Sequence, residues 1–385
     1  MKPLFLLLLT WLPGSFVAYA QFEVKGIVIN NQDQTPLPGA NVFLANTTKG
    51  TQTSADGTFS LRNIPAGKFE LVVSYIGFEK LVIPLQAESR KTYRINLIPS
   101  SHALDAVTIK ARRKKGLDWQ ENVDFFVRNF IGQSENAIHC KLLNPEVLYF
   151  ENTPEKFTTK AQEPVIIENR GLGYRLKFQL DEYSLNKTTQ RIFYSGHVVY
   201  ETLIPNNPEE EQKWVKNRQK AYYGSVMHFM RALYQRQLVE EGFMLREVVK
   251  KYLPNRDTLL VALPGDSTVY ITTKLFNKNN LPQQTLKYKH ILDSTLSTRV
   301  HPLLSFNNLL EVTYVNEAEP FAYFKRNQKP NDVFRATPQV STISLLRPNI
   351  TIESDGQYFD AAGIHYKGYW SWELVAEDLP VDYTP

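Results

Sequence analysis

Apolar and polar residues alternate with a period of two along residues 22–97, in short runs separated by turn residues. In the first run, Val24 and Val28 lie on the face opposite Lys25, as in a strand. Pro38-Gly39 and Asp56-Gly57 interrupt the alternation, because proline fixes φ and glycine tolerates a positive φ. About seven short strands without a helical period predict a small β-sandwich over residues 21–99.

Two later stretches have the period of amphipathic helices. In residues 118–131, one face collects the apolar side chains Trp119, Val123, Phe126, Val127, Phe130 and Ile131. Asp118 and Glu121 fit a capping box at the start of this helix. Residues 209–241 form the second helical segment, which Gly224-Ser225 is expected to divide, with Ser225 as an N-cap.

The remaining segments, within residues 141–203 and 259–353, are predicted strands, and residues 364–372 are a predicted pair of strands. They are rich in aromatic residues, which pair favourably across the strands of a sheet. We therefore predict a mainly β protein with some α, in which the sandwich is followed by a larger α+β domain with antiparallel sheet over residues 117–385. The basic run at 112–115 marks residues 100–116 as a linker, either solvated or in contact with an acidic partner or lipid head groups.

Residues 1–20 have the pattern of a signal peptide. Lys2 supplies the positive charge, residues 4–12 the apolar core, and Ala18-Tyr19-Ala20 the cleavage site. The alternative is a membrane anchor, but the apolar run is short for a span and ends at a Pro-Gly dipeptide. We therefore expect export to the periplasm or to the outer membrane, with no transmembrane helix after cleavage.

Composition narrows the classes of function. The 44 Lys and Arg residues against 39 Asp and Glu give a net charge of +5, spread along the chain, so no nucleic-acid partner is expected. Cys140 is the single cysteine, which excludes an intramolecular disulfide. We expect it to be a buried, inert thiol, because the adjacent His139 would point to the other side of a strand.

The familiar motifs of catalysis and cofactor binding are absent from the sequence. The seven histidines form no His-Glu-x-x-His pair, and there is no Gly-x-Ser-x-Gly elbow, phosphate loop or calcium loop. Gly171-Leu172-Gly173 precedes a strand, so we interpret it as a turn. We expect no metal and no cofactor. Carboxylates from distant segments can still meet in the folded chain, as in glycosidases, so a hydrolase stays open.

Polar residues gather in the second helical segment and form the candidate ligand- or anion-binding site, which comprises Arg218, Lys220, Ser225, His228 and Arg231. Ser225, His228 and Arg231 are spaced by three and lie near one helix face. Two interpretations are open: these side chains hydrogen-bond neighbouring strands and position the helix, or they bind a ligand. A second set is either core or a surface for glycan stacking: Tyr366, Tyr369, Trp370 and Trp372.

Residues 22–99 resemble a known domain. The turn signals Pro38-Gly39-Ala40-Asn41, Asp56-Gly57-Thr58-Phe59 and Ser74-Tyr75-Ile76-Gly77 occur in the order found in the carboxypeptidase-regulatory-like (transthyretin-like) domain. The resemblance implies a β-sandwich of the kind common at the N-termini of Bacteroidetes envelope proteins, including TonB-dependent nutrient receptors. The related domain of metallocarboxypeptidases carries no zinc ligand, so the resemblance implies no peptidase activity.

The stretch NRQKAYYGSVMHFMRAL, at residues 217–233, resembles a segment of multi-strand proteins that carry the same N-terminal domain. That resemblance groups residues 117–385 with a family-specific domain and implies no activity. All these features together predict an exported interaction or binding module of the cell envelope, without catalysis, that binds an envelope protein or a glycan. Peripheral association with the outer membrane is a further expectation.

The alternative is an envelope hydrolase, directed at glycans or peptides, with acid and base carboxylates assembled in the C-terminal domain. It requires a pocket that holds two carboxylates with perturbed pKa values.

Overall fold

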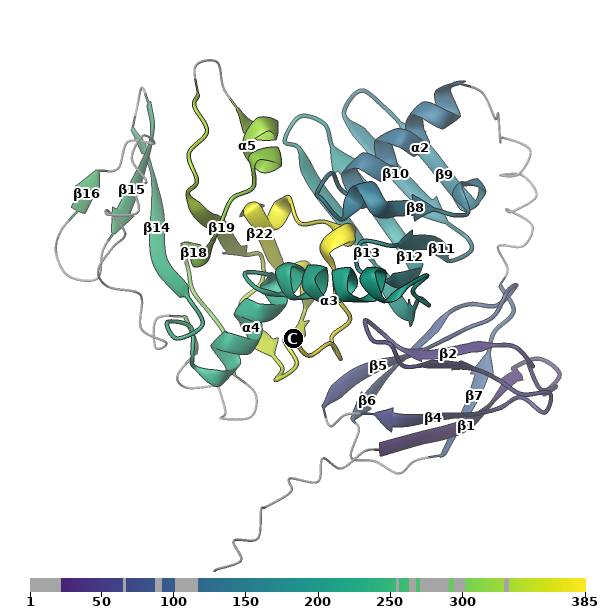
Figure 1. Cartoon of the computed structure of the whole chain (residues 1–385). Coiled ribbons are helices and arrows are strands. Elements are labelled where there is room, and N and C mark those ends of the chain that lie inside the picture. Colours follow the sequence, from purple (N-terminus) through teal and green to yellow (C-terminus); the bar gives the residue numbers. More distant parts are fainter. Residues whose placement is uncertain are drawn as a thin grey trace, which may run out of the picture.

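The structure, a computed structural model, is shown in Figure 1. It describes residues 22–64, 67–86, 92–100, 117–253, 256–262, 268–270, 291–293, 302–328 and 332–385, with backbone alone for residue 117 and for those from 249 to 270. The predicted signal peptide and nearly all of the predicted linker lie outside the described residues, and the predicted domain boundaries stay predictions. No helix in the described ranges is long and apolar enough to cross a membrane.

The strands between residues 22 and 97 form two facing sheets, purple and blue in Figure 1. In order, the strands of the first sheet are β4 (Thr58–Ile64), β1 (Phe22–Asn30) and β7 (Thr92–Leu97), and those of the second are β3 (Gly50–Gln52), β2 (Asn41–Leu44), β5 (Lys68–Ser74) and β6 (Leu81–Gln86). Leu44, Leu71 and Ile95 are buried between the sheets. Alternation along each strand turns these side chains inward, and the predicted β-sandwich is confirmed.

A helix and a second sheet form the next layer. Helix α2 (Leu117–Phe130) lies on the sheet β8 (Cys140–Leu142), β11 (Val165–Asn169), β12 (Tyr174–Asn186), β10 (Lys156–Ala161) and β9 (Leu148–Asn152), and β13 (Arg191–Thr202) pairs with β12. The Phe126 ring lies 5.1 Å from that of Tyr183, and the Phe130 ring lies 5.3 Å from that of Phe178. The predicted first helix and its apolar core face are confirmed.

The C-terminal part of the chain builds a third layer. In order, its sheet contains β16 (Thr268–Tyr270), β15 (Arg256–Ala262), β14 (Phe243–Leu253), β18 (Leu309–Ala318), β19 (Pro338–Leu345) and β22 (Ile364–Gly368), and a small sheet contains β17 (Leu303–Leu304), β20 (Ile350–Ile352) and β21 (Tyr358–Phe359). Helix α4 (Val226–Gln235) packs on this layer through Phe229, whose ring lies 5.4 Å from that of Phe243 and 5.2 Å from that of Trp370. The mainly β fold with some α is confirmed.

Two predicted segments differ from the structure. The helical segment 209–241 consists of α3 (Pro208–Tyr222) and α4, which ends at Gln235 because Arg236 takes a left-handed conformation with φ +60°. Ser225 caps α4 as predicted, since its side chain accepts from the backbone N–H of His228. The second predicted strand of residues 364–372 is a 3-10 turn at Tyr369–Ser371, which follows the positive φ of Gly368.

The C-terminal aromatic residues lie in the core. Tyr369, Trp370 and Trp372 are each less than a tenth exposed, and Tyr366 packs against the same cluster. Of the two interpretations of this set, the structure shows core packing, and it shows no exposed stacking surface at these residues. The reason is that the turn after β22 folds their rings back over the third layer.

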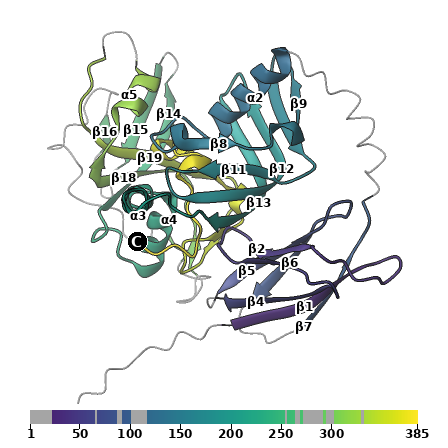
Figure 2. The same cartoon turned by 45° about the vertical axis from the view of Figure 1, so that its right-hand side comes forward.

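The sandwich is docked against β12 and β13, as both Figure 1 and Figure 2 show. Phe43, Ala45 and Val72 face outward from the sandwich and are nevertheless buried, where they pack with Val199 of β13. The second sheet of the sandwich is therefore covered on both faces, one by its own core and one by the larger domain.

Backbone hydrogen bonds join the two parts of the protein. The N–H of Asn46 donates to the carbonyl of Val198 at 2.7 Å, and the N–H of Tyr200 donates to the carbonyl of Thr47 at 3.0 Å. The loop after β2 thereby pairs with the edge of β13, in the manner of a short added strand. An edge that is paired in this way is not open to other strands.

The last residues of the chain lie in the seam between the two parts. The N–H of Val381 donates to the carbonyl of Asn46 at 2.7 Å, and the N–H of Thr48 donates to Asp382 at 2.9 Å. From the other side, Arg231 donates to the carbonyls of Val381 at 2.9 Å and Tyr383 at 3.0 Å. This segment links the sandwich to α4.

Candidate functional site

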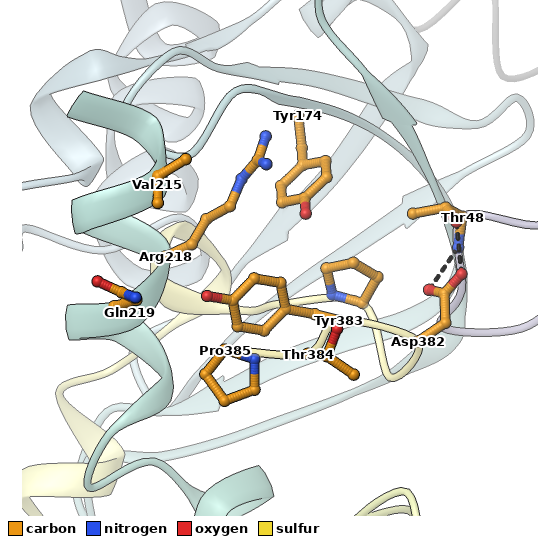
Figure 3. Close-up of a pocket in the computed structure, with 10 residues that line it drawn as sticks. Thr48, Tyr174, Val215, Arg218, Gln219, Asp382, Tyr383, Thr384 and Pro385 are labelled. Carbon is orange, nitrogen blue, oxygen red and sulfur yellow. Dashed lines mark hydrogen bonds between the residues drawn. The ribbon is translucent and has the colours of Figure 1, made fainter. Parts of the chain in front are cut away.

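An interdomain pocket of about 360 Å³ opens beside these last residues (Figure 3). It is lined by Thr48, Tyr174, Val215, Arg218, Gln219, Pro380, Asp382, Tyr383, Thr384 and Pro385. The side chain of Thr48 hydrogen-bonds Asp382 and closes one end. The walls therefore come from the sandwich, from β12, from α3 and from the C-terminal segment.

Arg218 builds the deep wall of the interdomain pocket. Its guanidinium lies 4.2 Å from the centroid of the Tyr174 ring, and its Nε donates to the carbonyl of Leu172 at 2.6 Å. The turn before β12 is also held by Trp214, whose Nε1 donates to the carbonyl of Arg170 at 2.6 Å. Arg218 is thus a structural donor to the backbone, and the predicted turn at Gly171-Leu172-Gly173 is confirmed.

A second pocket, of about 280 Å³, gathers carboxylates from distant parts of the larger domain. We call it the acidic pocket; it is lined by Ser134, Glu135, Asn136, Ile138, His139, Lys213, Asn217, Lys220, Glu317, Pro320, Ala322, Tyr369, Trp372, Glu373 and Glu377. Glu317 comes from β18, and Glu373 and Glu377 come from the turns after β22. Together with Glu135, four carboxyl groups therefore line one polar cavity.

Hydrogen bonds fix the floor of the acidic pocket. Asn136 donates to Glu377 at 2.7 Å, and Ser134 donates to the other oxygen of the same carboxylate. Asn217 of α3 donates to the side chain of Asn136 at 3.2 Å and to the carbonyl of Gly171 at 2.8 Å. These bonds hold the segment after α2, α3 and the C-terminal turns in one arrangement, so the cavity is preformed.

Burial and mutual repulsion raise the pKa values of carboxyl groups in the acidic pocket. Burial raises the pKa of Glu373 well above its usual value, and the charges of Glu377 and Glu317 raise it further. Burial also raises the pKa of Glu317, against the hydrogen bond from Gln339 and the charge of Lys220. The Glu373 carboxyl therefore keeps its proton to a higher pH than an ordinary glutamate, and in its protonated form it can donate a hydrogen bond or a proton.

The hydrolase alternative requires a pocket that holds two carboxyl groups with perturbed pKa values. Glu317 and Glu373 meet this requirement. Within the described residues, no group of three His, Cys, Asp or Glu side chains is placed to hold a metal ion. The arrangement can bind polar ligands, and it can also supply a protonated acid beside a second carboxyl group.

The structure does not bring the predicted site residues together in one place. Arg218 lines the interdomain pocket, and Lys220 lies at the rim of the acidic pocket, where it pairs with Glu135 at 2.7 Å. Arg231 donates to backbone carbonyls of the C-terminal segment, and Ser225 caps α4. These contacts position helices, and ligand binding at any of these residues stays a prediction.

His228 is enclosed by aromatic rings. Its ring lies 4.9 Å from that of Tyr222 and 4.8 Å from that of Phe243. Nδ1 accepts from the N–H of Gly224 at 3.1 Å, and Nε2 lies 2.9 Å from Glu241. Burial lowers the pKa of His228, against the opposing effect of Glu241, so the imidazole is a neutral structural group in the core.

Cys140 lies at the start of β8, half-buried. Its Sγ is 3.4 Å from the carbonyl of Asn136, and burial raises the pKa of the thiol to about 12. A thiol with this pKa carries almost no thiolate at neutral pH, which agrees with the predicted inert role.

The acidic pocket was not predicted residue by residue. Glu317 and Glu373 are 56 positions apart in the sequence, and each belongs to a segment that reads as an ordinary strand end or turn. The available signal was Glu317 near the end of β18 with Glu319 just after it, two carboxylates two residues apart beside a segment with several apolar residues.

A pH-dependent effect is expected at Glu319, whose pKa burial raises to about 7. Between the usual pKa of 4.5 and 7, the folded state binds more protons than the unfolded state, so this group destabilises the fold as pH rises through that window. Glu319→Gln should therefore raise the free energy of unfolding at pH 8 by about 1–2 kcal/mol, after allowance for solvent screening, and change little at pH 4.

Urea unfolding at both pH values measures this effect. Glu151→Gln, at an exposed position on β9, is the matched control and should leave both values unchanged. A gain for Glu319→Gln that is equal at pH 4 and pH 8 would show that the raised pKa is not its cause.

Comparison with known proteins identifies the type of domain in the N-terminal part of the chain. Residues 24–109 match the family model of the CarboxypepD_reg-like domain. A segment of 90 residues is 39% identical to the TonB-dependent receptor P39 of Formosa agariphila, and it covers 23% of this chain and 8% of that receptor. The N-terminal region is therefore a carboxypeptidase-regulatory-like domain, and the chain spans less than a tenth of the receptor that it matches.

Solved structures with local likeness include 3-chlorocatechol 1,2-dioxygenase from Rhodococcus opacus 1CP, at 14% identity over 22% of this chain and 61% of the enzyme, with a TM-score of 0.18. Another is the shaft pilin SpaA from Lactobacillus rhamnosus GG, at 12% identity over 21% of this chain and 47% of the pilin, with a TM-score of 0.19. Likenesses of this extent carry no argument about function.

Proposed function

We propose that the protein is an exported binding module of the cell envelope, without catalysis, and that the acidic pocket is its ligand site. The observation that supports this role is the convergence of polar side chains from four separate segments on one preformed cavity. Export is supported by the signal-peptide pattern of residues 1–20. The likeness of the N-terminal domain to part of a TonB-dependent receptor supports a location in the cell envelope.

A glycan is the ligand class that the lining fits best. The pocket offers acceptors at Glu377 and Glu317 and donors at Lys213 and, in its protonated form, Glu373. Sugar hydroxyl groups both donate and accept hydrogen bonds, so they match a lining of mixed polarity. An envelope protein that inserts a basic side chain between the carboxylates is the other partner class.

The test is a binding screen of the chain from Gln21 against envelope glycans and peptidoglycan fragments, followed by calorimetry on each hit. We expect Glu373→Gln, combined with Lys213→Ala, to lower the affinity of a hit about tenfold or more, because both side chains line the cavity. Glu146→Gln, an exposed position away from the cavity, is the matched control. Equal affinities of the three proteins for every hit would contradict the site.

A second candidate function, an envelope hydrolase, is favoured by one specific observation, the raised pKa of Glu373 in a pocket that it shares with Glu377 and Glu317. In that role Glu373 would act as general acid on a glycosidic or peptide bond, and a neighbouring carboxylate would activate water. Release of new reducing ends or free amines from the bound ligand, lost in Glu373→Gln with binding retained, would establish hydrolysis and refute the non-catalytic role.

A further inference from the structure

Helix α5 (Phe321–Asn327) lies at the end of the molecule remote from the sandwich, in both Figure 1 and Figure 2. One of its faces packs against the core. The ring of Tyr323 lies 5.4 Å from that of Tyr369 and 5.9 Å from that of Trp372, and the guanidinium of Arg326 lies 5.5 Å from the Trp372 ring. These contacts already fix the helix to the third layer.

The other face of α5 carries apolar side chains that the fold leaves uncovered. Phe321, Phe324 and Phe334 form an aromatic triad, with ring centroids 5.3, 5.4 and 6.1 Å apart. Phe321 is 58% exposed, Phe334 38%, and the adjacent Val333 76%. A helix that only caps a sheet needs one apolar face, so a second one at the surface indicates an interaction outside the chain.

Exposed cations adjoin the aromatic triad, since Lys325 follows Phe324 and Arg335 follows Phe334, whereas Pro320 and Ala322 at the start of the segment line the acidic pocket. Among the described residues from 320 to 337, Lys325, Arg326 and Arg335 are basic and Asp332 is acidic. Lys325 and Arg335 are exposed and form no ion pair with another described residue. Exposed aromatic rings flanked by cations match the interface of an anionic bilayer, where rings enter the head-group region and cations contact lipid phosphates.

We propose that the aromatic triad, together with Val333, Lys325 and Arg335, attaches the protein peripherally to an anionic lipid surface. The apolar side chains enter the head-group layer, and the two cations contact the phosphates. The small number of inserted residues makes the attachment reversible. The sandwich, at the opposite end of the molecule, then points away from the bilayer (Figure 1). This role does not depend on the ligand of the acidic pocket.

Vesicle flotation tests the attachment. The chain from Gln21, which lacks the apolar residues 4–12, is mixed with vesicles of phosphatidylglycerol and phosphatidylcholine or of phosphatidylcholine alone. We expect flotation with the anionic vesicles, weakened by salt. Phe321→Ser with Phe334→Ser should lower the affinity about tenfold or more, and Lys325→Gln with Arg335→Gln should remove the preference for anionic lipid. Ile76→Ser, at an 81% exposed position of the sandwich, is the matched control and should bind like the parent chain.

A second measurement keeps the result independent of folding defects. Phe334→Trp preserves the triad, and its emission, after subtraction of the parent chain's signal, should shift to the blue when anionic vesicles are added. Absence of flotation, equal flotation of the double serine variant, or an unshifted tryptophan would each overturn the proposal. Flotation that salt does not weaken, and that phosphatidylcholine supports equally, would overturn the part assigned to the cations.

Discussion

Replacing Val72 with aspartate is expected to separate the N-terminal sandwich from the rest of the protein. Val72 is fully buried on the outer face of β5, where it packs with Phe43, Ala45 and Val199. An unpaired carboxylate in that seam costs about 3–5 kcal/mol, and separation of the two parts returns it to water. Leu71 and Val73 point into the core of the sandwich, so the sandwich itself should stay folded.

Calorimetry and X-ray scattering measure this separation. The parent chain should unfold in one transition, because the seam couples its two parts, whereas Val72→Asp should show two transitions and a larger radius of gyration. Ile76→Asp introduces the same charge at an exposed position of the sandwich and should behave like the parent chain. A Val72→Asp protein that keeps the compact form and one transition would contradict the coupling.

The parts of the fold that were predicted correctly depend on local signals. Pro38-Gly39 and Asp56-Gly57 set turns through their own backbone preferences, and Ser225 caps α4 through a contact three residues away. The end of α4 was placed too late, because nothing in the apolar pattern of residues 236–241 indicates the left-handed Arg236. The docked seam was missed, although the unbroken apolar run Leu71-Val72-Val73 is typical of a strand that is covered on both faces.

The candidate sites depend on long-range contacts that one sequence does not specify. Arg218 and Arg231 were named as candidate ligand- or anion-binding residues, but their hydrogen-bond acceptors in the structure are backbone carbonyls far along the chain, which no residue type reveals. The acidic pocket forms because β18 and the turns after β22 converge in space. Carboxylates that meet in the folded chain were considered, but their residues were not named. Sequence spacing does not show which residues of separate sheets lie close together in space.

Replacing Gly173 with alanine is expected to have the largest effect of any conservative change near the interdomain pocket. Gly173 has a positive φ of +73°, and an added Cβ would lie 2.4 Å from the ring of Trp214 and 2.9 Å from Arg218. Trp214 is buried and holds the turn before β12, so α3 must move and Arg218 loses its carbonyl acceptors. Backbone strain and overpacking together should lower the free energy of unfolding by about 3–5 kcal/mol.

Two other glycines allow the cost of backbone strain to be measured apart from the cost of steric overlap. Gly39 and Gly77 also have positive φ values, of +77° and +84°, but no atom lies within 4 Å of their added Cβ. Gly39→Ala and Gly77→Ala should therefore cost only about 1 kcal/mol each, the penalty for alanine in the left-handed region. Denaturant unfolding of the three variants compares these losses. If Gly173→Ala loses no more than Gly77→Ala, the turn before β12 is not packed against Trp214, and the wall of the interdomain pocket does not depend on it.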